Sequence, residues 1–179
     1  MNVDYTALRF NQAAIVVLVV AAFLLDAREL VAAVAAWRVW RAEGGALPSM
    51  MAGHSLGEYS ALVAAGVLTL AQAAPLVRFR AQAMQDAVPA GVGAMAAVLG
   101  LSADAVVAGC LEAQTSFGPG SIEVVEAVNY NDPMQTVIAG SKAAVDKACE
   151  LLKAGGAKRA LPLPVSAPFH SSLMKPAAE

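Results

Sequence analysis

The first half of the chain contains three stretches in which apolar residues recur every three or four positions. This is the period of an amphipathic helix. Gly44 and Gly45 follow the first stretch and Gly66 follows the second, as glycine commonly does at helix C-termini. The pattern predicts helices over residues 28–43, 56–65 and 69–87.

Local features refine these helices. Thr69 and Gln72 resemble a capping box at the start of the third helix. Pro75 falls in its second turn and has no backbone N–H, so a late start or a local kink is expected. Residues 48–52 form a short apolar run bounded by turn residues, which predicts a buried strand between the first two helices.

The segment before the first helix carries an unbroken apolar run. Residues 13–25 (AAIVVLVVAAFLL) are too few to span a bilayer, which takes about 20 residues. The preceding stretch contains Asp4 and Arg9 rather than a basic cluster, which disfavours a secretory signal. We expect a buried helix or strand here, and no membrane association.

The second half alternates short apolar strands with amphipathic helices. Residues 89–93 form a loop that marks a lobe boundary. Ser102 and Ser141 are expected to cap the two helices. The pattern predicts strands at 94–99, 122–128, 135–139 and 157–163, and helices at 102–115 and 141–155. The order β-α-β-β-α-β is the ferredoxin-like pattern of a self-sufficient small lobe.

Composition and charge exclude several classes of function. Hydrophobic residues make up 58% of the 179 residues, and the net charge is −2, so no general electrostatic attraction to nucleic acid exists. Cys110 and Cys149 lack metal-type spacing and are expected to be buried free thiols in a reducing compartment. With two cysteines and two histidines, we expect no metal site. Basic residues outnumber acidic ones from residue 141 onward, which suits either an acidic partner or a solvated helix face.

Residues 53–57 (Gly-His-Ser-Leu-Gly) have the Gly-x-Ser-x-Gly pattern of a nucleophile elbow, between a predicted strand and a predicted helix. Small flanking residues let the Ser55 hydroxyl project from a sharp turn. The following helix directs its first N–H groups at an oxyanion. The pattern predicts that Ser55 is an acyl-accepting nucleophile, although glycine and serine also occur together in ordinary turns.

A serine nucleophile needs a base, and the chain has two histidines. His54 is adjacent to Ser55, and side chains of adjacent residues at a strand end point to opposite sides. His170 follows the fourth predicted strand of the lobe, on a loop where the chain would return to the main sheet. By elimination, His170 is predicted to be the general base.

Arg80 lies in a largely apolar part of the third predicted helix. A guanidinium in a cleft needs an anionic partner and suits a carboxylate. Met84 is one turn further on and shares its face. On spacing alone, a solvated Arg80 paired with a surface acid is the stronger alternative.

Several long motifs in order resemble the malonyl-CoA:acyl-carrier-protein transacylases. The resemblance extends from about residue 31 to the end of the chain. It is carried by residues 53–67, 84–89, 129–140 and 157–178.

The resemblance implies a reaction and a role for each matching residue. Ser55 would take a malonyl group from malonyl-CoA as an ester, and His170 would transfer the proton. Arg80 would bind the free malonyl carboxylate. The Leu56 N–H would donate to the oxyanion, and substrate-binding positions would include Met84, Asn129, Gln135 and Phe169. Phe169 resembles the malonyl-selective pattern of related polyketide acyltransferase domains.

The resemblance also implies a setting. The acceptor would be the phosphopantetheine thiol of acyl carrier protein, in fatty acid or polyketide synthesis in the cytoplasm, with no cofactor beyond the substrate malonyl-CoA. The basic residues beyond Ser141 are candidates to contact the acidic carrier protein.

The expected fold is α/β. Residues 1–90 would form a partial α/β-hydrolase-like core with a parallel sheet and the elbow. Residues 91–164 would form an inserted ferredoxin-like lobe, and residues 165–179 would return to the core with His170.

The chain departs from the family at both ends. It lacks the family's Gly-Gln-Gly-Ser-Gln loop, which supplies a second oxyanion donor, and it ends nine residues after His170. Loss of one such donor typically lowers turnover by about a hundredfold or more. The departures at both ends predict a truncated member of the family. A non-catalytic paralogue and a serine thioesterase or esterase are the alternatives.

Overall fold

A computed structural model describes residues 27–165 and 167–179. The chain divides into two compact units, one ending at Ala81 and one beginning at Gln82, and each is described by itself. The apolar run at residues 13–25 lies outside the described residues. The expected return of residues 165–179 to the core stays a prediction. None of the described helices is long and apolar enough to cross a membrane.

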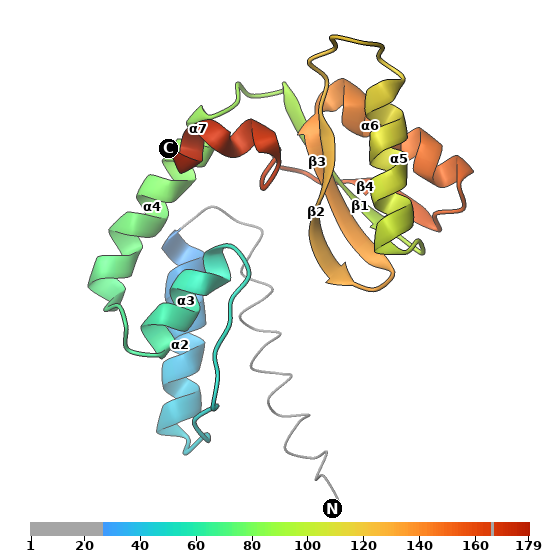
Figure 1. Cartoon of the computed structure of the whole chain (residues 1–179). Coiled ribbons are helices and arrows are strands. Elements are labelled where there is room, and N and C mark those ends of the chain that lie inside the picture. The colour runs from blue at the N-terminus through green and yellow to red at the C-terminus, as the bar shows by residue number, and fades with distance from the viewer. Residues whose placement is uncertain (1–26, 166) are drawn as a thin grey trace, which may run out of the picture. The chain divides into compact units, whose positions relative to one another are not determined.

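The first unit is built from helices α2 (Ala27–Ala42), α3 (Leu56–Ala64) and most of α4 (Leu70–Asp86), close to the predicted bounds (Figure 1). Each contributes apolar residues to one core at the predicted helical spacing. The fully enclosed members of this core are Leu30, Val34, Leu56, Ala73 and Val77. The core fixes α3, and therefore Ser55 before it, against α4.

The capping box at the start of α4 is confirmed. The Thr69 hydroxyl accepts from the Gln72 N–H (3.2 Å), and the Gln72 side-chain oxygen accepts from the Thr69 N–H (3.0 Å). The expectation of a late start is wrong, because α4 begins at Leu70 and Pro75 lies inside it. Pro75 is exposed, at a position where the missing N–H leaves one helical hydrogen bond unmade.

The buried strand predicted at residues 48–52 is wrong. The structure has no strand in this segment, and Met50 is 86% exposed. A strand needs neighbouring backbone to satisfy its N–H and C=O groups. Within the described part of the chain, no strand pairs with this segment, and the parallel sheet expected for the core is not present.

The second unit follows the predicted element order. It contains β1 (Gly93–Leu99), α5 (Ala103–Thr115), β2 (Val125–Asp132), β3 (Gln135–Ser141), α6 (Lys142–Ala154) and β4 (Arg159–Pro162). A short 3-10 helix, η2 (Ser172–Met174), and α7 (Lys175–Ala178) follow. The chain therefore has an α/β fold with a small antiparallel sheet.

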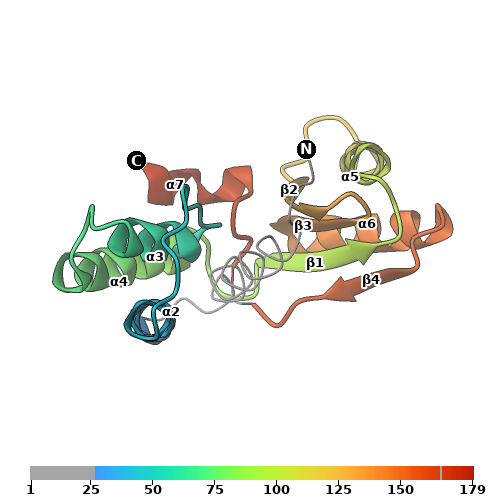
Figure 2. The same cartoon turned by 90° about the horizontal axis from the view of Figure 1, so that it is seen from below.

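The strands form one sheet in the order β2-β3-β1-β4 (Figures 1 and 2). All three neighbouring pairs are antiparallel. The β2–β3 pair contains two register shifts, one between Ala127 and Asn129 and one between Tyr130 and Asp132. After each shift, the residues of β2 lie on the opposite face from the one that strict alternation would give.

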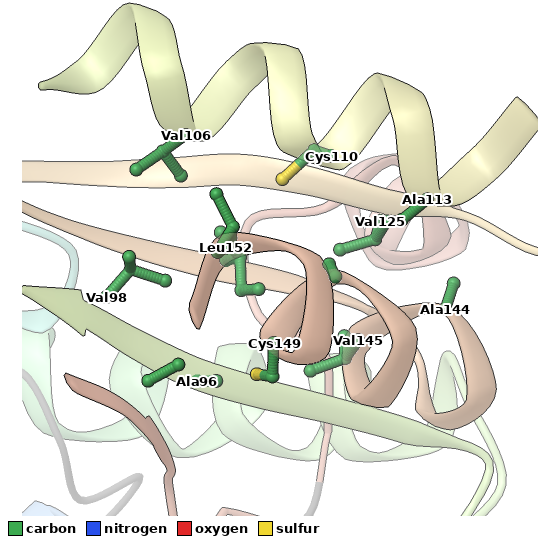
Figure 3. Close-up of a cluster of buried hydrophobic side chains, with 13 residues drawn as sticks. Ala96, Val98, Val106, Cys110, Ala113, Val125, Ala144, Val145, Cys149 and Leu152 are labelled. Carbon is green, nitrogen blue, oxygen red and sulfur yellow. The ribbon is translucent and has the colours of Figure 1, made fainter. Parts of the chain in front are cut away.

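Helices α5 and α6 cover one face of this sheet. Val106 and Cys110 from α5 pack with Val145, Cys149 and other residues of α6 over the strands (Figure 3). The opposite face carries a second cluster, in which Phe169 and other residues that follow β4 pack against β1 and β3. The buried members of this cluster are Met95, Val137 and Ala139.

Two local predictions in this unit need correction. Strand β2 begins at Val125 rather than residue 122, and Ile122 is 89% exposed. Ser141 precedes α6 but makes no side-chain capping bond to it. Its hydroxyl instead donates to Glu123 and accepts from the Val124 N–H (3.1 Å). It therefore holds the two residues that directly precede β2. Ser102 does cap α5, by accepting from Ala105 (3.4 Å).

Candidate active site

Residues 53–57, called the serine elbow below, form a sharp turn into α3. Ser55 has φ 55° and ψ −114°, a conformation that costs a non-glycine residue about 1 to 3 kcal/mol. A Cβ on Gly53 would overlap the backbone carbonyl of Gly57, so the turn requires glycine at position 53. The close approach of these two backbones explains the first glycine of the Gly-x-Ser-x-Gly pattern physically.

The N-terminus of α3 lies directly after Ser55. The N–H groups of Gly57 and Glu58 donate to the carbonyls of His54 (2.9 Å) and Ser55 (3.2 Å). Leu56 is the first residue of the helix, where no carbonyl of the same helix can accept from its N–H. Its N–H is therefore suited to the predicted oxyanion contact next to Ser55.

Arg80 reaches the serine. Its guanidinium donates to the Ser55 hydroxyl oxygen at 2.8 Å, and the pair is part-buried. Val77, one turn earlier on α4, is buried in the core beside α3 and so orients this face of the helix. Arg78 is exposed. The structure therefore favours a site role for Arg80 over a solvated surface pair. Met84 follows one turn further along α4.

His170 lies in the second unit, in a turn formed by residues 168–171 and called the histidine turn below. The Ser171 N–H donates to the Pro168 carbonyl (3.2 Å), and the Ser171 hydroxyl donates to the same oxygen (2.7 Å). His170 has φ 66° and an exposed side chain. Its pairing with Ser55 stays a prediction.

Three other predicted substrate-binding residues belong to the face of the small sheet opposite α5 and α6. Asn129 pairs with Val137, and Gln135 is two residues before Val137 on β3, so all three share this face. Phe169 packs on the same face. The Asn129 side chain is buried, and its Oδ1 has no hydrogen-bond partner in the described structure.

The sequence interpretation missed Glu126. Its carboxylate accepts from the Ser172 N–H at 2.6 Å, two residues beyond His170. No local pattern indicates this contact, because 46 positions separate the two residues. The alternation of β2 could only have placed Glu126 on the same sheet face as Asn129 once the register shift between them was known.

The two cysteines are structural. Burial raises the pKa of the Cys110 thiol to about 12, helped by the nearby charges of Cys149 and Glu126. Burial also raises the pKa of Cys149. Both thiols are therefore protonated at neutral pH and unsuited to nucleophilic attack. Among the described residues, no cluster of three histidine, cysteine or acidic side chains could hold a metal ion.

Residues 28–179 match the family model described as acyl transferase domain. The chain is 56% identical over 150 residues to the malonyl CoA-acyl carrier protein transacylase of Escherichia coli (strain K12), covering 84% of this chain and 47% of that protein. The crystal structure of the acyl-carrier-protein S-malonyltransferase from Burkholderia pseudomallei 1710b is 64% identical with a TM-score of 0.78, covering 84% of this chain and 47% of that chain.

A further solved structure is of a type II PKS acyl-carrier protein in complex with its malonyl-transacylase. It matches at 52% identity and a TM-score of 0.77, covering 85% of this chain and 47% of that chain. This chain therefore spans about half the length of the curated relatives it matches.

Proposed function

Because this chain belongs to the acyl transferase domain family, we propose that Ser55 carries a malonyl group from malonyl-CoA to an acyl carrier protein. The acceptor is the phosphopantetheine thiol of that carrier protein, in fatty acid or polyketide synthesis. Relatives named malonyl CoA-acyl carrier protein transacylase, more than half identical to this chain, support the substrate. The cytoplasmic location implied by the sequence resemblance stays a prediction.

The contact between Arg80 and Ser55 carries the proposal. In a malonyl ester, one methylene separates the free carboxylate from the carbonyl carbon bonded to the serine oxygen. A guanidinium that reaches the Ser55 hydroxyl at 2.8 Å is therefore also within reach of that carboxylate. Arginine binds carboxylates through two parallel N–H donors, which favours malonyl over an acyl group that has no free carboxylate.

The first half-reaction forms an ester. The Ser55 oxygen attacks the thioester carbonyl of malonyl-CoA, the C–O bond forms, and the C–S bond breaks as coenzyme A leaves. In the contact with Arg80 the serine oxygen is the acceptor, so that contact does not use the hydroxyl proton. We assign the transfer of this proton to the leaving sulfur to His170, and stabilisation of the oxyanion to the Leu56 N–H.

The second half-reaction reverses these steps on the carrier. The phosphopantetheine thiol loses its proton to His170 and attacks the Ser55 ester. The new C–S bond forms and the ester C–O bond breaks, returning the proton to Ser55. The reaction is a group transfer, so no cofactor is required beyond the donor malonyl-CoA and the phosphopantetheine thiol of the carrier protein.

We assign substrate contacts to Met84, Asn129, Gln135 and Phe169. The buried, unpartnered Oδ1 of Asn129 supports this assignment, because a buried acceptor without a donor loses free energy that a ligand N–H or O–H would restore. Phe169 packs against the buried cluster of Met95, Val137 and Ala139, which supports a fixed position for its side chain.

For the fold, we propose a partial α/β-hydrolase-like core with an inserted ferredoxin-like lobe. The sheet order β2-β3-β1-β4 and the βαββαβ connectivity support the lobe assignment. The positive φ of Ser55 at the entry to α3 supports the core assignment, because a strained turn into a helix is one part of the nucleophile elbow.

The acyl carrier protein, as the acidic partner, would contact basic residues after Ser141. Lys142 and Lys147 form ion pairs with Asp146 (2.6 Å) and Glu150 (3.6 Å). Among the described residues, three exposed basic side chains around the end of α6 and the start of β4 have no such pair. These are Lys153, Lys158 and Arg159.

Labelling with malonyl-CoA tests the proposal directly. We expect a malonyl mass increment on the peptide that contains Ser55, and none on that peptide in Ser55→Ala. The mass spectrum of the intact chain and its peptides gives both results. Absence of label on Ser55 in the folded wild-type chain would overturn the assignment and favour the non-catalytic alternative.

Selectivity tests the role of Arg80. Arg80→Ala should lose most of the preference for malonyl-CoA over acetyl-CoA in the same labelling reaction, whereas Arg78→Ala, on the exposed side of the same helix, should keep it. An unchanged preference in Arg80→Ala would remove it from carboxylate binding. Release of the label to water, with none passed to a carrier protein, would indicate a thioesterase instead.

A further inference from the structure

The histidine turn holds His170 in a conformation that it would not keep by itself. The hydrogen bond from the Ser171 N–H to the Pro168 carbonyl closes a four-residue turn with His170 in the third position at φ 66°. Only glycine adopts this left-handed region without a steric cost. The turn therefore needs fixed contacts on both sides to hold the imidazole in one direction.

Two contacts hold the side of the turn before His170. A Cβ on Gly93 would overlap the ring of Pro168, so the ring lies directly on the backbone at the start of β1. Phe169 packs against the cluster of Met95, Val137 and Ala139, on the sheet face opposite α5 and α6. Both contacts are apolar and have no directional hydrogen bond. They therefore fix where the turn lies more than how it is oriented on the sheet.

One polar contact holds the other side. The Glu126 carboxylate accepts from the Ser172 N–H at 2.6 Å, a short distance typical of hydrogen bonds to an ionised acceptor. Glu126 is on β2 and pairs with Ala139 of β3, so a hydrogen-bonded sheet fixes its backbone. The contact ties the chain two residues after His170 to a rigid element.

We propose that Glu126 is a positioning residue for His170, acting through the Ser172 N–H. Its carboxylate closes the open end of the histidine turn and so fixes the direction of the imidazole. The inference rests on the proposed function insofar as His170 is the base for Ser55. The geometry on which it depends, from Glu126 to Ser172, lies entirely within the second unit.

The test uses the two histidines as reporter and internal control. In the full chain labelled with ¹⁵N-histidine, imidazole resonances of His170 should shift or broaden in Glu126→Ala, while those of His54 stay in place. Glu126→Gln keeps an oxygen that can accept from Ser172 and should resemble the wild type. Glu126→Asp keeps the charge on a side chain one methylene shorter and should resemble Glu126→Ala.

Enzyme kinetics give the second readout. Glu126→Ala should slow acylation of Ser55 by malonyl-CoA about ten- to a hundredfold, because small misplacements of a catalytic group have effects of this size. Glu126→Gln should restore most of the rate. Glu112→Ala, which removes an exposed carboxylate on α5, should leave the rate unchanged.

Two outcomes would overturn the proposal. One is a set of His170 resonances in folded Glu126→Ala or Glu126→Asp that matches the wild type. The other is Glu126→Gln perturbing His170 as much as Glu126→Ala, which would show that the charge matters and the hydrogen bond does not. If the wild-type chain fails to acylate Ser55, the proposed function fails, while the imidazole resonances still decide the role of Glu126.

Discussion

The serine elbow and the histidine turn both place a polar side chain on backbone with positive φ, but they are held in different ways. In the elbow, Ser55 is fixed by its neighbours, because Gly53 and Gly57 lie two positions to either side. In the histidine turn, His170 depends on Gly93 and Glu126, which are far away in sequence. A locally built site is visible as a motif, whereas a site built by tertiary contacts is not.

Gly53→Ala should have the largest effect, because the added Cβ has no space beside the Gly57 carbonyl. We expect a loss of about 3 kcal/mol in stability of the first unit, and about a hundredfold or greater loss of Ser55 labelling. Hydrogen exchange and labelling with malonyl-CoA measure the two effects.

Gly66→Ala is the matched control for this substitution. Gly66 also has positive φ (76°), but a Cβ there meets nothing within 4 Å. Gly66→Ala should therefore lower the free energy of unfolding only by the steric cost of a Cβ at positive φ, about 1 to 2 kcal/mol. Equal effects at the two positions would contradict the close-approach explanation of the elbow.

Gly93→Ala should disturb the histidine turn without touching the elbow. The added methyl group displaces the Pro168 ring, at a cost of about 1 to 3 kcal/mol to the second unit. Imidazole resonances of His170 should move and those of His54 should not. Gly118→Ala, in a loop where a Cβ meets nothing within 4 Å, should leave both histidines unaffected.

Alkaline pH should weaken the second unit alone. The pKa of Cys110 is about 12 in the folded chain against 9.0 without burial, so the folded state holds this proton more tightly. The resulting stability is complete below pH 9 and is lost as pH rises toward 12, by about 3 kcal/mol at pH 11. Unfolding measured against pH in the wild type and in Cys110→Ala should show this component only in the wild type.

Thr69→Ala should have the smallest effect, about 1 kcal/mol, because it removes the capping bond to Gln72 at the start of α4. Ser102→Ala removes the corresponding cap of α5 in the second unit. Segment-resolved hydrogen exchange should assign each loss to its own unit. A loss from Thr69→Ala that spreads equally into the second unit would argue against separate units.

What the sequence could predict was the local structure. The capping box at Thr69 and the element order of the second unit follow from patterns that extend over a few residues. Ser55 at the entry to α3 follows from the Gly-x-Ser-x-Gly motif. These features need no information about distant partners.

The errors have the opposite origin. Residues 48–52 have the composition of a strand, but a strand exists only where another strand pairs with it. Ser141 has the position of a cap, yet its hydroxyl bonds to Glu123 and Val124 because tertiary structure brings β2 beside it. Likewise, the contact between Glu126 and Ser172 joins residues 46 positions apart, which no local pattern encodes.

Both edge strands of the small sheet have features that disfavour pairing with a strand from another chain. At one edge, β4 has four residues and ends in Pro162, which has no N–H to offer to an added strand. At the other edge, the two irregularities of β2 interrupt the even spacing that another chain would have to match. Proteins blunt exposed strands in these ways to avoid aggregation. Copies of this chain are therefore not expected to join edge to edge into a continuous sheet.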